Sequence, residues 1–174
     1  TKDSSFSEYI YFIPQYAGTY LIGVNYAAET KSPADVPGYA TVELFSINNQ
    51  VEHYVVPSSV VVPADAKGVT SVGAINHMTG MIEPFSSQGP TNHAKQAPFM
   101  VGPDGVTTLA YNGDLFYGTS ATTPYIAGVT ALIKQMNPDA SPQEIQELLK
   151  KNAEITSGVT SKNNLNSIGV GTVN

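Results

Sequence analysis

The chain has no cysteine and no arginine among its 174 residues, and each absence excludes a class of function. Without cysteine it can form neither a disulfide bond nor a thiolate metal site, which excludes a zinc-thiolate centre. Its lysines number 8 against 14 acidic residues, so the net charge is −6 and no basic patch is available for nucleic acid. We therefore predict that nucleic acid is not a partner.

Long apolar runs and a calcium-binding spacing are also missing. The run from Ile126 to Ile133 is too short for a transmembrane helix, which needs roughly 18 or more apolar residues, and it predicts a core helix. The aspartates are scattered rather than spaced as in a calcium loop. The sequence therefore predicts no membrane span, no metal and no cofactor.

The first part of the chain is rich in tyrosine. Aromatic and β-branched residues dominate segments 9–13, 20–26 and 40–45, which are separated by clusters of Gly, Pro, Asn and Ser. This pattern predicts strands, and we expect residues 1–56 to form a small antiparallel β-sandwich. Its tyrosines either form the core of this module or contact a substrate, a surface or a partner.

The most specific motif is GTSATTPYIAG at residues 118–128. It predicts a tight turn at Gly118 that leads into a helix, with Pro124 in the first helical turn. Unpaired N–H groups at a helix start can stabilise an oxyanion that forms beside a hydroxyl. We take Ser120 as the candidate nucleophile, with Gly118 and Thr119 as turn and oxyanion support. The alternative is that Ser120 only caps the helix, since serine is a preferred N-cap residue.

This motif resembles the active-site serine segment of the subtilisin-like serine proteases, the subtilases. The family pattern is Gly-Thr-Ser, then Met or Ala, Ala, Thr or Ser, Pro, His, Val, Ala and Gly, so Thr122 replaces an alanine and Tyr125 a histidine. The resemblance covers residues 57–174. It includes the apolar run at 69–75, FSSQGP at 85–90, PFMVGPDGV at 98–106 and IGVGTVN at 168–174. In the third of these segments Gly102 replaces an alanine and Asp104 precedes the glycine.

The resemblance implies an α/β fold in which residues 57–174 form the C-terminal part of a subtilase catalytic domain. That part is a partial subtilisin-like, mainly parallel sheet with helices. The implied activity is a serine endopeptidase that acts on polypeptides outside the cell or at its surface. Phe116 and Tyr117, just before the turn, are expected to line the leaving-group side of the substrate site. Independently, the capping box from Ser141 to Glu144 predicts a second helix, with Ile145 and Leu149 on its apolar face.

The rest of the family's catalytic set is absent. No His-Gly-Thr, Asp-Ser/Thr-Gly or Ala-Ala-Gly-Asn string occurs, and His53, His77 and His93 are predicted to be partly exposed polar residues. We therefore expect a C-terminal piece of a longer protease, inactive by itself, whose upstream part supplies the histidine and aspartate. A partial sheet would also leave an open edge and promote self-association. The alternatives are a catalytically dead subtilase-like scaffolding domain at the cell surface, and an adhesive role for the β-sandwich.

Overall fold

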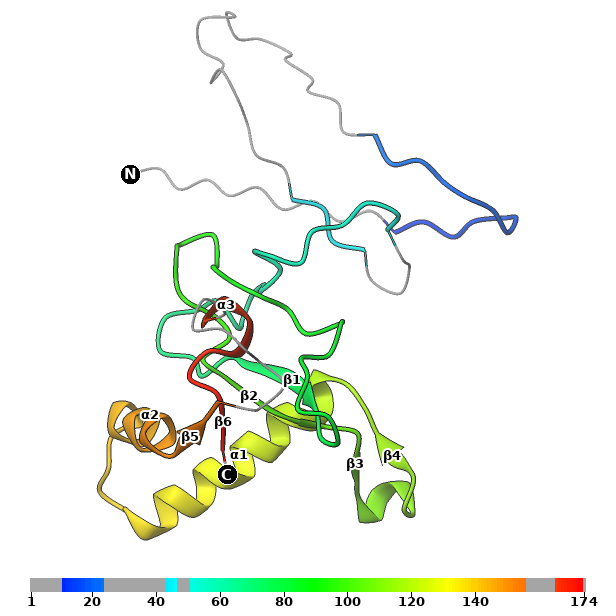
Figure 1. Ribbon diagram of the computed structural model, residues 1–174. Helices are drawn as coiled ribbons and strands as arrows, with labels where there is room; N and C mark the ends of the chain where they lie inside the picture. The colour runs from blue at the N-terminus through cyan, green and yellow to red at the C-terminus, as the bar shows by residue number, and fades with distance from the viewer. Residues whose placement is uncertain (1–10, 24–42, 47–50, 156–164, 174) are drawn as a thin grey trace, which may run out of the picture. The chain divides into compact units, whose positions relative to one another are not determined.

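The computed structural model describes residues 11–23, 43–46, 51–155 and 165–173. The chain divides into two compact units, Thr1–Asn48 and Asn49–Asn174. Among the described residues, all helices and strands belong to the second unit. They occupy the green to red part of the ribbon in Figure 1.

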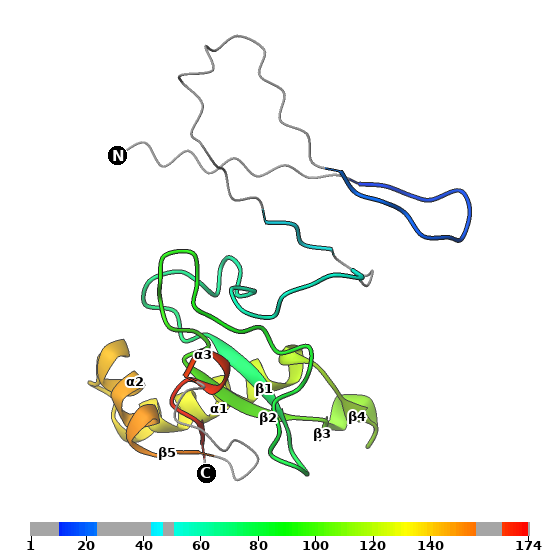
Figure 2. The same ribbon diagram turned by 45° about the horizontal axis from the view of Figure 1, so that its top comes forward.

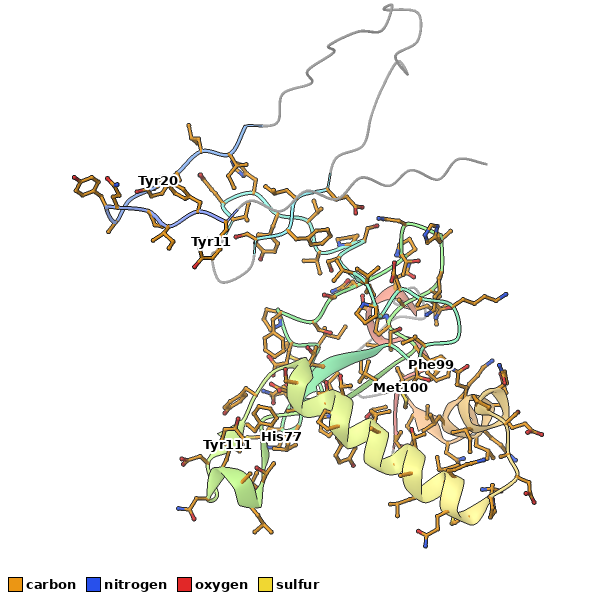
Figure 3. The ribbon with its side chains drawn as sticks, turned by 180° about the vertical axis from the view of Figure 1, so that it is seen from behind. Tyr11, Tyr20, His77, Phe99, Met100 and Tyr111 are labelled. Atoms are coloured by element: carbon orange, nitrogen blue, oxygen red, sulfur yellow. The ribbon has the colours of Figure 1, made fainter. Side chains whose placement is uncertain are left out.

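The expected N-terminal β-sandwich is not confirmed. Residues 11–13, 20–23 and 43–45, which are the described parts of its three predicted strands, form no strand. Their large side chains are exposed, and Tyr11 is 88% and Leu21 97% accessible. Phe12 and Tyr20 make an edge contact with their ring centroids 5.1 Å apart (Tyr11 and Tyr20 are labelled in Figure 3). Strand propensity alone does not hold two strands together in water unless they bury a face. The remainder of this predicted module lies outside the described residues.

The second unit is built on a four-stranded sheet in the order β1-β2-β6-β5 (Figure 1). Three of its strands are parallel, namely β1 (Val72–Asn76), β2 (Met100–Asp104) and β6 (Thr172–Val173). The fourth, β5 (Ala153–Glu154), is antiparallel to β6. A separate antiparallel pair consists of β3 (Val106–Thr107) and β4 (Leu115–Phe116), with the short 3-10 helix η2 (Leu109–Tyr111) between them. A mixed α/β fold with a mainly parallel sheet is therefore confirmed.

The helices are α1 (Thr119–Met136), α2 (Pro142–Lys151) and α3 (Leu165–Ile168). The predicted capping box starts α2: the Ser141 hydroxyl accepts the Glu144 N–H, and the Ser141 N–H donates to the Glu144 carboxylate over 2.7 Å. Ile145 and Leu149 lie buried on the apolar face of this helix, as expected.

Helices cover both faces of the sheet. Because side chains alternate along a strand, Met100 and Val101 of β2 point to opposite faces. Met100 packs against Ile126 of α1 and Leu149 of α2, whereas Val101 packs against Ile168 of α3. Figure 2 shows α3 in front of β1 and β2 with α1 behind them. The first cluster holds α1 and α2 on one face of the sheet, and the second holds α3 on the other.

Only one face of α1 is buried, which corrects the expectation of a core helix. Ala121, Thr122 and Ile126 are buried, but Leu132 is 62% and Met136 77% exposed. An apolar run in the sequence does not show which of its residues meet a neighbouring element. No helix in the described ranges is both long enough and apolar enough to cross a bilayer.

The outer edge of β1 is occupied by the chain that follows it. Asn76 N–H donates to Met81 O over 2.8 Å, Glu83 N–H to Ala74 O over 3.0 Å, and Ala74 N–H to Ser86 Oγ over 3.0 Å. These bonds satisfy backbone groups that an open edge would offer to another chain. Self-association of the chain stays a prediction, with less support from this edge than the sequence suggested.

Candidate active site

The candidate site lies where the carboxyl end of β2 meets the start of α1. Gly118 is the N-cap residue of α1, with φ 105° and ψ 167°, and no side chain caps the helix. Ser120 therefore lies inside the first turn, and the alternative that it serves as the cap is wrong. The carboxyl ends of parallel strands are where open α/β sheets usually place their sites.

Ser120 presents an exposed, unbonded hydroxyl beside free main-chain donors. Its side chain is exposed, and its hydroxyl has no hydrogen-bond partner in the described part of the chain. The N–H groups of Ala121 and Thr122 both reach Gly118 O, over 2.8 Å and 3.4 Å. Those of Thr119 and Ser120 find no acceptor among the described residues. A nucleophilic oxygen and two available N–H groups therefore share one helical turn.

Asp104, the last residue of β2, is bonded to this turn. It lies two residues beyond Gly102 and four beyond Met100, on the face of the sheet that α1 covers. Its side chain is 1% exposed. The Oδ1 atom accepts the Gly118 N–H over 2.6 Å, whereas Oδ2 is buried and has no partner within the described residues. Sequence reasoning noted Asp104 only as a departure from the family pattern, and that departure was the available signal.

His77 lies against the same strand end. It follows β1 and is exposed, and its Nδ1 is 2.8 Å from the backbone oxygen of Asp104 (labelled in Figure 3). Because a carbonyl oxygen only accepts, Nδ1 is the donor in this contact. The expectation of exposed polar histidines is confirmed for His77, His53 and His93. The sequence contained no signal for the contact between His77 and Asp104.

Phe116 and Tyr117 lie directly before the turn. Phe116 stacks on Tyr111, with ring centroids 4.8 Å apart and an interplanar angle of 16°. Tyr117 is 57% exposed and passes close to Gly105. A Cβ on Gly105 would stand 3.0 Å from Tyr117 Cε1 and 3.2 Å from His77 Nδ1. The contribution of Phe116 and Tyr117 to a leaving-group site stays a prediction.

Two departures from the family pattern face each other behind the nucleophile. Thr122, in place of an alanine, is fully buried, and its hydroxyl donates to Thr119 O over 3.1 Å. Gly102, also in place of an alanine, faces it across the interface between β2 and α1. A Cβ on Gly102 would lie 3.4 Å from Thr122 Cβ and 3.2 Å from Ile126 Cγ1. The glycine therefore allows β2 and α1 to approach closely at this point, with Ile126 as the nearest side chain.

Pro124 lies in the second turn of α1, so its predicted place in the first turn is wrong. The helix begins at Thr119, and the N–H that Pro124 lacks would have bonded Ser120 O. The carbonyl of Ser120 thus receives no helical hydrogen bond from residue 124. The sequence motif located the helix but not its first residue.

Comparison with known proteins finds a family model and several proteases that resemble this chain. A family model described as the subtilase family matches residues 24–171. Serine protease AprX of Bacillus subtilis (strain 168) is 32% identical over 116 residues, covering 53% of this chain and 26% of that protein. The cell wall-associated protease of the same organism is 36% identical over 94 residues, covering 53% of this chain and 10% of that protein.

A solved structure shares the fold. The structure of the Clostridium perfringens CspB protease matches 70% of this chain and 28% of its own, with a TM-score of 0.59 and 26% identity. The matched part of the chain therefore spans 26% of the length of AprX, 10% of the cell wall-associated protease and 28% of the CspB chain.

Proposed function

The chain belongs to the subtilase family, and on that premise we propose that it is the nucleophile-bearing part of a serine endopeptidase. In the proposed reaction, Ser120 Oγ attacks the scissile carbonyl carbon of a polypeptide and an acyl-enzyme forms as the amine leaves. Water then hydrolyses the ester and restores the hydroxyl. The observation that carries the proposal is the exposed, unbonded hydroxyl in the first turn of α1.

The main-chain donors beside Ser120 suit the negative charge that such an attack creates. The N–H of Ser120 has no acceptor within the described residues, and that of Thr119 is equally available. Both lie at the positive end of the α1 dipole. In this proposal they stabilise the oxyanion of the tetrahedral intermediate, while Phe116 and Tyr117 border the leaving group.

The proton acceptor is supplied from outside this sequence. A serine hydroxyl without an adjacent base is a weak nucleophile at neutral pH. Loss of one oxyanion donor costs about 2.7–4 kcal/mol of transition-state stabilisation, a value measured in subtilisin, the protease for which this family is named. We infer that an upstream part of the same polypeptide contributes the histidine, the aspartate and a further oxyanion donor. The 174-residue chain by itself is therefore inactive on peptides.

The proposed location is outside the cell or at its surface. The relative named as a cell wall-associated protease supports this location. Its match covers only 10% of that relative, so the location is tested separately, by fractionation of the producing cells.

The test is covalent labelling with a fluorophosphonate, followed by a peptide cleavage assay. The full-length protein should label at Ser120 and cleave an unfolded protein substrate, and Ser120→Ala should abolish both activities. Thr123→Ala is the matched control, because it removes an exposed hydroxyl from the same helix. The 174-residue chain should not label.

Two results would contradict the proposal. Rapid labelling of Ser120 in the isolated chain would show that no upstream base is needed. A folded full-length protein that neither labels nor cleaves would favour the scaffolding alternative.

A further inference from the structure

We propose that Asp104 is a positioning residue for Ser120, acting through the N–H of Gly118. This inference rests on the proposed protease function and adds one side chain to that site. The hydrogen bond that Asp104 accepts from the helix start comes from Gly118 and not from Ser120. Its role is to fix the turn that presents both the hydroxyl and the free N–H groups.

The contact is direct, and its acceptor, Asp104, is buried. Asp104 is 1% exposed and sits at the end of a strand that is paired on both sides. Its Oδ1 accepts the Gly118 N–H over 2.6 Å, which is a short hydrogen bond. No side chain caps α1, so this bond ties the residue before the helix to the central sheet.

The geometry of Gly118 explains why a tether is needed. With φ 105° and ψ 167°, Gly118 lies in a region that only glycine enters readily, and glycine there is free to leave it. Ser120 follows two residues later, with the unbonded N–H groups of Thr119 and Ser120 between them. A rotation at Gly118 would therefore move the nucleophile and its oxyanion donors together.

Burying the Asp104 side chain costs free energy, because only one of its two oxygens accepts a hydrogen bond within the described residues. Its Oδ2 is buried without a partner in the part of the chain that the structure describes. A buried polar atom without a hydrogen-bond partner is costly. An amide at this position would keep the acceptor for Gly118 and remove the ionisable group. Asp104→Asn is therefore the conservative variant, and Asp104→Ala removes the tether.

Kinetics of the full-length protein test the role. Asp104→Ala should lower kcat about 10- to 100-fold and change KM by less than about twofold, because misplaced oxyanion donors weaken only the transition state. Asp104→Asn should restore kcat to within about fivefold of the wild type, since its carbonyl oxygen still accepts the bond. Asp114→Ala is the matched control: this carboxylate is exposed on the loop between η2 and β4, and kcat should not change.

Three kinetic outcomes would overturn the inference. The first is a folded Asp104→Ala protein with wild-type kcat. The second is a loss confined to KM, which would indicate a role in binding substrate. The third is an Asn variant as slow as the Ala variant, which would show that the charge matters and the tether does not.

A second measurement on the 174-residue chain is independent of catalysis. The Gly118 amide proton should resonate far downfield and be protected from hydrogen exchange. In Asp104→Ala that protection should fall about 10- to 100-fold, and in Asp104→Asn it should largely remain.

The kinetic and the hydrogen-exchange measurements distinguish a failure of the proposed protease function from a failure of the inference about Asp104. An inactive wild-type full-length protein whose Gly118 amide still depends on Asp104 would refute the protease function and leave Asp104 as the residue that fixes the turn. If the exchange protection of the Gly118 amide is the same in the wild type and in Asp104→Ala, the inference about Asp104 is overturned and the proposed protease function is not affected.

Discussion

Gly118→Ala should slow the reaction of Ser120 more than its effect on stability explains. Gly118 has φ 105° and ψ 167°, a conformation that L-residues avoid. An added Cβ would stand 3.6 Å from the Ser120 nitrogen, which is an ordinary van der Waals contact. The penalty therefore arises from the backbone conformation and not from a collision.

The magnitude follows from two opposing terms. Holding a non-glycine residue in such a region costs about 1–3 kcal/mol. Alanine also lowers the entropy of the unfolded chain, which returns about 0.4–1 kcal/mol. The free energy of unfolding should therefore fall by roughly 0–2.6 kcal/mol. The alternative is that the turn relaxes to a negative φ, which lowers this cost and displaces Ser120.

Gly113→Ala is the matched control. Gly113 also has a positive φ, 92°, and a Cβ there would meet nothing within 4 Å, so alanine at this position likewise meets a backbone penalty without a collision. Urea unfolding of the 174-residue chain compares the stability of the two variants. Fluorophosphonate labelling of the full-length protein compares their Ser120 reactivity, which should fall about tenfold or more only for Gly118→Ala.

Two results would refute this reasoning. Wild-type labelling of Gly118→Ala would show that the turn does not control Ser120. Equal losses of labelling in both variants would show that the effect reports global stability and nothing specific to the turn.

Three further predictions concern the helices and are checked by urea or acid unfolding of the 174-residue chain. Leu149→Ala should lower the free energy of unfolding by about 2–5 kcal/mol, because Leu149 is 1% exposed. Leu132 is 62% exposed, so Leu132→Ala should lower it by less than about 0.5 kcal/mol. Similar losses in the two variants would contradict the assigned core. Gly128→Ala should stabilise the chain by about 0.5–1 kcal/mol, because a Cβ inside α1 at that position meets nothing within 4 Å; a lower urea midpoint would speak against it. The backbone N–H of Ser141 lowers the pKa of Glu144 below its ordinary 4.5. The contribution of Glu144 to the free energy of unfolding is therefore complete above pH 4.5, and it is lost as the pH falls through the lower pKa of the folded state. Glu144→Gln should remove that part of the acid unfolding profile, and an unchanged profile would contradict the assignment.

Features whose causes lie within a few residues were predicted from the sequence. The capping box from Ser141 to Glu144 contains both donors and both acceptors of the start of α2, so its four residues suffice. Gly118 and the residues after Ser120 likewise predicted a turn followed by a helix, although not the residue at which α1 begins. The mainly parallel sheet followed from the family resemblance, which the match over residues 24–171 supports.

Local pattern failed where the outcome depended on distant neighbours. Residues 11–13, 20–23 and 43–45 have strand composition but bury no face, so in the described residues they form no strand. The apolar run at 126–133 predicted a buried helix, yet α1 meets the sheet on one face only. Composition describes what a segment can bury, and tertiary structure decides what covers it.

The sequence by itself determined that a serine would open a helix after a glycine turn. Tertiary structure alone decided what holds that turn, because Asp104 and Gly118 are 14 residues apart and meet only where β2 ends beside α1. The contact between His77 and Asp104, 27 residues apart, depends in the same way on the parallel pairing of β1 and β2. A hydrogen bond between separate elements is set by how those elements pack, and no local spacing in the chain encodes it.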